Sequence, residues 1–377
     1  PAKLFSRLCK AEGETAAEQY FKNALCVKPA KTELCKKTVA AEKRITDLSG
    51  KSSYSLYISI PFCPTRCAYC SFVSHSVEQA RRLIPQYIAL LCEELRLTAE
   101  IAKKLSLKLE TIYMGGGTPT TLSSEQMQQL LAAIADSFDL SRCLEFTVEG
   151  GRPDTLDERK LRVIKEGGAT RISINPQTMS DQVLAAVGRR HTAKQTITAF
   201  EQAVRAGFDD INMDLIAGLP GDTPESFAAS LDAVLALAPS NITVHTLALK
   251  RGAELAMRQL TLPSAEDVRQ MLQYAERALR ERGYAPYYLY RQKYMSGSFE
   301  NVGWCKPGYA GLYNIYMMEE LHSILSLGGG AMTKINLPDG TLERFHNPKF
   351  PQQYLARLDD VLAQKAQAFA LLNRKER

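Results

Sequence analysis

The sequence predicts an α/β fold: a partial (β/α)6 parallel barrel with a helical N-terminal extension and a small α+β C-terminal cap. First, a short β-rich segment alternates six times with a longer amphipathic segment. Second, the strand segments are nearly continuous apolar runs bordered by turn residues, as in parallel strands buried on both faces. Third, this pattern changes near residue 284. A doubly wound sheet would show the same alternation and stays an alternative.

The barrel is expected over residues 54–283. Its strands are expected in "SLYISI", "LETIYMGG", "LEFTVEG", "TRISINP", "DINMDLI" and "NITVHTLAL". Helices are expected near residues 77–104, 123–137, 155–166, 192–206 and 223–237. Because the chemistry of a parallel barrel collects at the carboxyl ends of its strands, the functional residues are expected there.

The two flanking regions are expected to be smaller. Residues 1–53 have a helical pattern, and the chain begins at Pro1 without an initiator Met, so we expect a truncated N-terminus. Residues 284–377 are expected to form the cap, which would be a substrate domain. There "YAPYYLYRQKY" and "HSILSLGGGAMTKINLPDGTLERF" predict strands with a Pro-Asp-Gly turn, followed by a helix near residues 351–369.

The composition is that of an ordinary globular protein. The chain has 377 residues, of which 45% are hydrophobic and 23% charged, and a net charge of +6. Its apolar stretches, such as "LIPQYIALL", are far shorter than the ~20 residues that cross a bilayer, and no signal peptide is evident. Lys and Arg are dispersed rather than gathered in a basic stripe. We therefore expect a cytoplasmic protein with no membrane insertion and no nucleic-acid partner.

Three of the nine cysteines have the spacing of metal ligands. Cys63, Cys67 and Cys70 form a C-x₃-C-x₂-C pattern, whereas the other six are scattered and are expected to be small apolar fillers. A structural zinc site needs four protein ligands, and no fourth lies nearby. An iron–sulfur cluster held by three thiolates leaves one iron open for a small molecule. A zinc site completed from afar and three plain core cysteines stay as alternatives.

The cysteine pattern, with an aromatic residue before the last cysteine, resembles a known family. "YISIPFCPTRCAYCSF" is similar to the cluster loop of the radical S-adenosylmethionine (SAM) enzymes. The resemblance implies a 4Fe-4S cluster held by Cys63, Cys67 and Cys70, whose open iron chelates the amino and carboxylate groups of SAM. One electron from the cluster then cleaves SAM to methionine and a 5′-deoxyadenosyl radical, while the protein supplies placement and excludes water.

Further motifs narrow this resemblance. "YMGGGTPT", "RISINPQT", "GRRHT" and "MDLIAGLPGDT" follow one another as in the oxygen-independent coproporphyrinogen III dehydrogenase family, and the likeness extends from about residue 54 to 348. "VEGGRPDT" and "ENVGWCKPG" resemble its HemZ-like branch. The resemblance implies oxidative decarboxylation of coproporphyrinogen III propionates to vinyl groups, giving protoporphyrinogen IX in haem biosynthesis. It also implies a flavodoxin or ferredoxin as electron donor.

The resemblance also assigns residues to as many as two SAM molecules. Tyr57 and Glu149 are the candidate catalytic residues, and with Gly116 and, more loosely, Met332 they match positions at the first SAM. The positions that match the second SAM are Tyr69, Gly117, Thr118, Gln177, Arg189, Asp214 and Ala248. Structural roles stay open for all of them: a tight turn for the glycines, a salt bridge between Glu149 and Arg152, and barrel-rim hydrogen bonds for the others.

Two departures from the family keep other functions open. Ser59 stands where many members have a histidine before Pro-Phe-Cys. "YNIYMM" replaces the His-Asn-x-x-Tyr-Trp signature of related haem chaperones, with Tyr313 for the histidine and Met317–Met318 for the aromatic pair. The second departure disfavours haem binding through that motif. A tetrapyrrole-modifying radical methyltransferase and a haem-binding chaperone-like protein are the alternatives.

A tetrapyrrole substrate with four carboxylates needs cationic partners, for which arginine and lysine are suited. The candidates in the cap are Arg291, Lys293 and Lys306, and a solvated surface role stays equally open for each.

Overall fold

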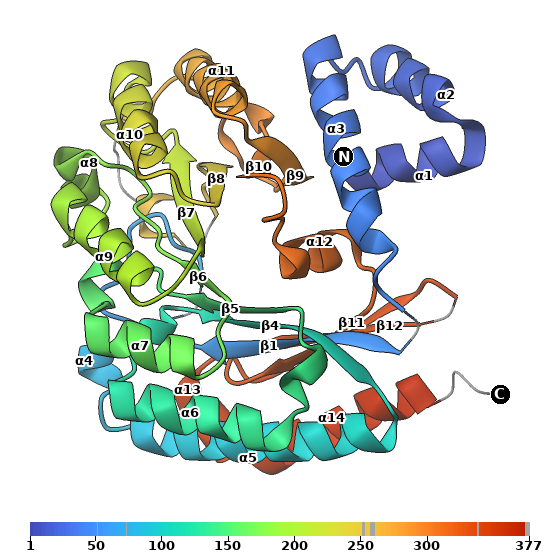
Figure 1. Ribbon diagram of the computed structural model, residues 1–377, viewed down its shortest axis with the longest axis vertical. Helices are drawn as coiled ribbons and strands as arrows, with labels where there is room; N and C mark the ends of the chain where they lie inside the picture. Colours follow the sequence, from blue (N-terminus) through green and yellow to red (C-terminus); the bar gives the residue numbers. More distant parts are fainter. Residues whose placement is uncertain (51, 73, 251–252, 257–260, 338, 374–377) are drawn as a thin grey trace.

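The structure is a computed structural model that describes residues 1–50, 52–72, 74–250, 253–256, 261–337 and 339–373. Within these residues, eleven strands form one sheet in the order β13-β12-β11-β1-β4-β5-β6-β7-β8-β10-β9. Figure 1 shows the sheet curving so that helices α5–α7 and α9–α11 cover its outer face, while α12 (Leu312–Glu319) lies on the concave side. This curvature leaves an interior at the carboxyl ends of the central strands.

Six consecutive parallel strands form the centre of the sheet. They are β1 (Ser53–Ile60), β4 (Lys108–Gly116), β5 (Glu145–Glu149), β6 (Arg171–Ser173), β7 (Asp210–Ala217) and β8 (Asn241–Thr246). Most of their side chains are buried, because helices cover one face and the barrel interior lies on the other. The predicted (β/α)6 partial barrel is therefore confirmed.

The connections between these strands are helical, as the sequence predicts. The helices are α5 (Ile84–Lys104), α6 (Ser124–Ser137), α7 (Glu158–Glu166), α8 (Asp181–Ala186), α9 (Ala193–Arg205), α10 (Pro224–Leu237) and α11 (Ala265–Glu281). Four of them begin with a capping box, in which the N-cap side chain and the third residue of the helix satisfy each other's backbone N–H groups. Helix α11, which is not among the predicted helices, is one of these and has Ser264 as its N-cap.

The prediction of one continuous helix near residues 77–104 is wrong. The short helix α4 (Val77–Ala80) ends before α5 begins, and Pro85 stands in the first turn of α5. Proline has no N–H to donate to the carbonyl four residues earlier, so it fits the first turn of a helix better than the interior of one. The short pair β2 (Phe62–Cys63) and β3 (His75–Ser76) brackets the cysteine loop.

The segments that flank the barrel in sequence pack against it at both ends of the sheet. Before β1 come α1 (Ala2–Glu12), α2 (Glu14–Gln19) and α3 (Pro29–Thr46). After α11, β9 (Ala285–Tyr290) and β10 (Asn301–Cys305) extend the sheet beyond β8, and β11 (Ser323–Leu327) pairs with β1 in parallel. Strands β12 (Met332–Asn336) and β13 (Leu342–His346) and helices α13 (Pro351–Ala356) and α14 (Leu358–Asn373) follow. The domain boundaries at residues 53 and 283 stay a prediction.

A buried cluster of polar side chains links the C-terminal helices to α5 of the barrel. Glu94 of α5 accepts hydrogen bonds from the Gly328 backbone at 2.8 Å, Tyr354 at 2.7 Å and Asn347 at 3.1 Å. It also forms an ion pair with Lys365 of α14 at 3.0 Å.

A search of the described residues finds no helix with the length and apolar character of a membrane span.

Candidate active site

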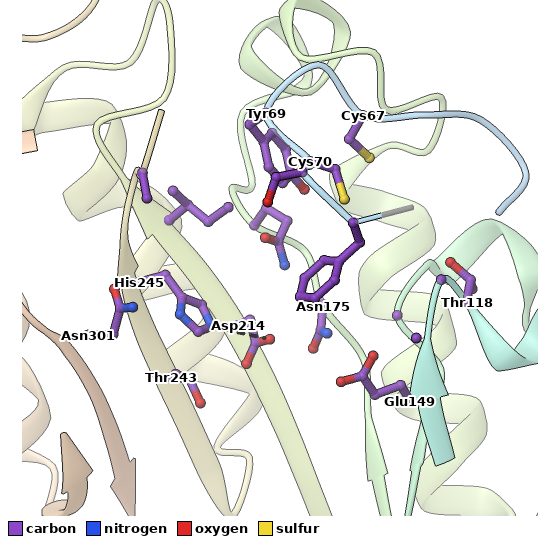
Figure 2. Close-up of a pocket in the computed structure, with 18 of the residues that line it drawn as sticks. Cys67, Tyr69, Cys70, Thr118, Glu149, Asn175, Asp214, Thr243, His245 and Asn301 are labelled. Carbon is purple, nitrogen blue, oxygen red and sulfur yellow. Dashed lines mark ion pairs between the residues drawn. The ribbon is translucent and has the colours of Figure 1, made fainter. Parts of the chain in front are cut away.

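One cavity of about 410 Å³ opens at the carboxyl ends of the parallel strands. Figure 2 shows the cysteine loop on one side and the side chains of Glu149, Asp214 and His245 projecting from strands on the other. The cavity is also bounded by residues from β9, β10 and α12, which close its remaining side. This is the place where parallel barrels carry their chemistry.

All three predicted cluster ligands line this cavity. Cys67 is buried, and Cys63 and Cys70 are partly exposed on the same loop. The hydroxyl of Thr118 lies 3.6 Å from the sulfur of Cys63, and the guanidinium of Arg152 lies 3.8 Å from the sulfur of Cys67. Two of the sulfurs therefore have a hydrogen-bond donor beside them.

The glycine run after β4 passes directly against the cysteine loop. A methyl group on Gly117 would lie 2.6 Å from the backbone oxygen of Phe62 and 2.9 Å from the sulfur of Cys63. Gly116 has φ +112, a conformation that other residues rarely adopt. The Gly117 and Thr118 amides donate to the Ile60 and Phe62 carbonyls at 2.9 and 2.7 Å. These glycines thus bring two backbone segments together beside the thiols.

The donor set consists of three free cysteines on one loop at the cavity, and cysteine thiolates are the ligands that hold iron–sulfur clusters. The residues present therefore fit such a cluster. Burial raises the pKa of Cys63, and that of Cys70 to about 11, so metal binding must displace their protons.

Glu149 lies at the end of β5 and is hydrogen-bonded to Tyr113 of β4, which donates to its carboxylate. Burial raises the pKa of Glu149 to about 7, although this hydrogen bond favours the charged form. Arg152 forms its ion pair with Asp154 rather than with Glu149. The salt bridge that offered a structural role for Glu149 is therefore not formed.

Asp214 at the cavity wall belongs to a polar network on β7 and β8. Its carboxylate lies 3.5 Å from Nε2 of His245 and accepts a 2.8 Å hydrogen bond from Asn212. Burial alone would raise the pKa of Asp214, but His245, Asn212 and Thr243 outweigh burial and lower it. A negative charge is thus held at the centre of the cavity wall.

Arg189 and Gln177 are positioned mainly by backbone contacts. Arg189 donates to the carbonyl of Asn175 at 2.5 Å and, through Nε, to the hydroxyl of Tyr69 at 3.1 Å. Gln177 has φ +70, which is uncommon for a residue with a Cβ and recurs at ligand-binding positions. Its backbone N–H donates to the backbone carbonyl of Asp214 at 2.9 Å. This hydrogen bond holds the loop after β6 against β7.

The structure brings most of the predicted site residues to this one cavity. Those that line it are Cys63, Cys67, Cys70, Tyr69, Gly116, Gly117, Thr118, Glu149, Gln177, Arg189, Asp214 and Ala248. Tyr57 and Met332 are not part of its lining. Tyr57 lies deeper in the barrel, with its ring stacked 6.2 Å from Tyr113 and 6.3 Å from Tyr313, whereas Met332 pairs with His346 at the far edge of the sheet. The roles of all these residues stay predictions.

The structure also shows where the residues that depart from the family patterns lie. Ser59 is buried and donates to the Gly329 carbonyl at 2.8 Å, so its hydroxyl has a structural partner and does not face the cavity. Tyr313 is buried and stacks on Tyr113 at 4.5 Å.

The candidate cations of the cap do not line the cavity. Arg291 and Lys293 are exposed, and Lys306 donates to the Ala238 carbonyl at 2.6 Å. Lys250, which is not among the predicted cations, is part of the lining.

Several further residues of the cavity wall are absent from the sequence-based prediction. They are Tyr113, Arg152, Asn175, Asn212, Thr243, His245, Tyr288, Tyr290, Asn301, Asn314 and Met318. A signal for part of this set is present in the strands, where polar residues recur at every second position of otherwise apolar runs, as in Asn212 and Asp214 or Thr243 and His245. In a strand this spacing places both side chains on one face.

The chain is similar in sequence to several known proteins. The family described as the radical SAM superfamily matches residues 57–234. The oxygen-independent coproporphyrinogen-III oxidase-like protein HemZ of Bacillus subtilis (strain 168) is 41% identical over 319 residues, which are 84% of this chain and 64% of that protein. The chain thus spans less than two thirds of the length of this relative.

Two further similarities agree with this result. The heme chaperone HemW of Lactococcus lactis subsp. lactis (strain IL1403) is 34% identical over 281 residues, which are 74% of this chain and 68% of that protein. The solved structure of coproporphyrinogen III oxidase (HemN) from Escherichia coli, a radical SAM enzyme, superposes with a TM-score of 0.66 at 22% identity, over 89% of this chain and 79% of that one. This superfamily implies a 4Fe-4S cluster and SAM. The chain therefore belongs to the radical SAM superfamily and, within it, to the family that contains the HemN-, HemW- and HemZ-type proteins.

Proposed function

We propose that the protein is a radical SAM oxidoreductase that converts two propionates of coproporphyrinogen III to vinyl groups by oxidative decarboxylation, giving protoporphyrinogen IX. The observation that carries the proposal is a convergence. The cysteine loop and the predicted cofactor-binding residues of five strands and their loops face one cavity. The names of the relatives HemZ, a coproporphyrinogen-III oxidase-like protein, and HemN, a coproporphyrinogen III oxidase, support a tetrapyrrole of this class as substrate.

In this proposal each wall of the cavity has its own task. Cys63, Cys67 and Cys70 hold a 4Fe-4S cluster, which together with bound SAM supplies a radical that abstracts hydrogen. Gly116 lets the backbone approach the cofactor. Glu149 is able to donate or accept a hydrogen bond near neutral pH, because its pKa is raised to about 7.

A second set of residues, some of them beside the cysteine loop, would orient a second SAM molecule. The proposed contacts of a second SAM are Tyr69, Gly117, Thr118, Gln177, Arg189, Asp214 and Ala248. Lys250 at the same cavity is the proposed partner of a substrate carboxylate. A flavodoxin or ferredoxin as electron donor and a cytoplasmic location are part of the proposal.

The test is an anaerobic reaction of the reconstituted protein with SAM, a strong reductant and coproporphyrinogen III. Mass spectrometry follows the tetrapyrrole and 5′-deoxyadenosine together. We expect stepwise loss of two carboxyl groups. Asp214→Asn should slow this loss at least tenfold, and Asp209→Asn, which changes an exposed carboxylate, should leave it unchanged. Cys67→Ala should abolish both the cluster and SAM cleavage.

The outcomes separate the chemistry from the substrate. Production of 5′-deoxyadenosine by Cys67→Ala would contradict the role of the cysteine loop. Cleavage of SAM beside an unchanged tetrapyrrole would reject the decarboxylation and leave the cluster and cofactor sites intact.

Haem binding is a second candidate function, because His245 and Met318 line the same cavity. Imidazole and thioether are both common ligands of haem iron. Titration with haem would then give a ligand-bound absorption spectrum that His245→Ala loses. His346→Ala, which changes an exposed histidine on β13, is the matched control.

A further inference from the structure

A buried arginine of the cavity wall lies beside the cysteine loop. Arg152 follows β5, and only 3% of its side chain is exposed. Its Nε and Nη2 donate to the two carboxylate oxygens of Asp154, each at 3.0 Å. Its Nη1 lies 2.9 Å from the hydroxyl of Thr65 and 3.8 Å from the sulfur of Cys67.

These contacts exclude a role for Arg152 in holding a substrate carboxylate. A guanidinium binds a carboxylate with two neighbouring N–H groups. One such edge of Arg152 is occupied by Asp154, and Nη1 is directed at Thr65 and Cys67. Burying a charge is costly unless it is paired, and Asp154 supplies the partner that keeps Arg152 charged beside Cys67.

We propose that Arg152 is a positioning residue that raises the reduction potential of the iron–sulfur cluster through the sulfur of Cys67, and that Asp154 holds it in place. A reduced cluster carries one more negative charge than the oxidised cluster. A fixed positive charge and an N–H group directed at a ligand sulfur therefore stabilise the reduced form. The effect is strong here because the guanidinium is almost completely removed from water.

The groups around Arg152 set the sign of this effect. Asp154 opposes it, but its carboxylate lies on the guanidinium edge away from the contact with Cys67. His191 lies 3.8 Å from Asp154, and burial lowers its pKa to about 4, so it adds no charge at neutral pH. Arg189 is a second cation near Cys67, and it also lines the cavity. Arg152 is paired with Asp154, so the charge at this position can be altered by changing either residue.

The proposal rests on the cluster that the family implies and on no particular substrate. A failed decarboxylation assay therefore leaves it untouched, and iron content shows separately whether a variant still holds its cluster.

The test is an anaerobic redox titration of the reconstituted protein without SAM, followed by the electron paramagnetic resonance signal of the reduced cluster. In Arg152→Gln we expect the ratio of reduced to oxidised cluster at a given solution potential to fall at least tenfold. For a one-electron couple that is a shift of about 59 mV to more negative potential. Asp154→Asn should shift the potential in the opposite direction, because it removes the opposing charge.

Further variants distinguish electrostatics from damage to the fold. Arg152→Lys keeps the charge and should restore most of the potential. The double variant Arg152→Gln/Asp154→Asn avoids an unpaired buried charge and should lie below the wild type. Arg159→Gln removes an exposed arginine nearby in sequence and should match the wild type.

Two results would overturn the proposal. The first is a potential in Arg152→Gln equal to that of Arg159→Gln at the same iron content. The second is a shift of Asp154→Asn in the same direction as Arg152→Gln, which would indicate a general loosening of the loop. If Arg152→Gln does not fold, the sign of the Asp154→Asn shift decides the question.

Discussion

Replacing Glu149 by glutamine should change how the stability of the protein depends on pH. Burial raises the pKa of Glu149 from 4.5 to about 7 in the folded protein. The folded state therefore keeps this proton over a range of pH in which the unfolded chain has lost it. Stability depends on pH wherever the two states bind different numbers of protons.

The sign and size of the effect follow from these two values. Between pH 4.5 and 7 the folded state binds more protons, so the free energy of unfolding falls as pH rises through this range. At ~1.4 kcal/mol for each pH unit, the total loss is about 3 kcal/mol. Glutamine has no proton to lose and its carbonyl can still accept the hydrogen bond from Tyr113, so the variant should lack this decline.

The measurement is urea unfolding of the metal-free protein, with thiols kept reduced, at several values between pH 4.5 and 8. The difference in unfolding free energy between Glu149→Gln and the wild type should grow by about 3 kcal/mol across this range. Glu201→Gln, which changes an exposed carboxylate on α9, should run parallel to the wild type. A Glu149→Gln curve that also runs parallel to the wild type would refute the reasoning.

Two further predictions concern packing. Gly117→Ala places a methyl group 2.9 Å from the sulfur of Cys63. It should destabilise the fold by about 1–3 kcal/mol and lower the iron content after reconstitution. Gly329→Ala, where the nearest atoms lie 3.7 Å away, is the control, and equal iron contents in the two variants would contradict the prediction. Lys365→Met leaves Glu94 buried without its cation and should lower the free energy of unfolding by about 3–5 kcal/mol, so an unchanged urea midpoint would show that this ion pair contributes little.

Short-range sequence pattern was sufficient to predict the barrel and to place the three candidate cluster cysteines on one loop at its cavity. Alternating apolar and amphipathic segments indicate parallel strands joined by helices, because each element buries a face of its own period. The spacing of Cys63, Cys67 and Cys70 lies within one loop, so no distant contact is needed to bring the three together. The break before α5 was missed because the helical pattern outweighed Pro85.

The partners across the barrel required the tertiary structure. Arg152 reaches Cys67 across 85 residues, Tyr313 of α12 stacks on Tyr113, and Ser59 binds the carbonyl of Gly329. Periodicity decides which face of a strand a side chain occupies. It does not decide how strongly the sheet curves, and this curvature sets which side chains meet in the interior. The sequence by itself thus determined the barrel and its three thiols, whereas only the packed fold decided which charges surround them.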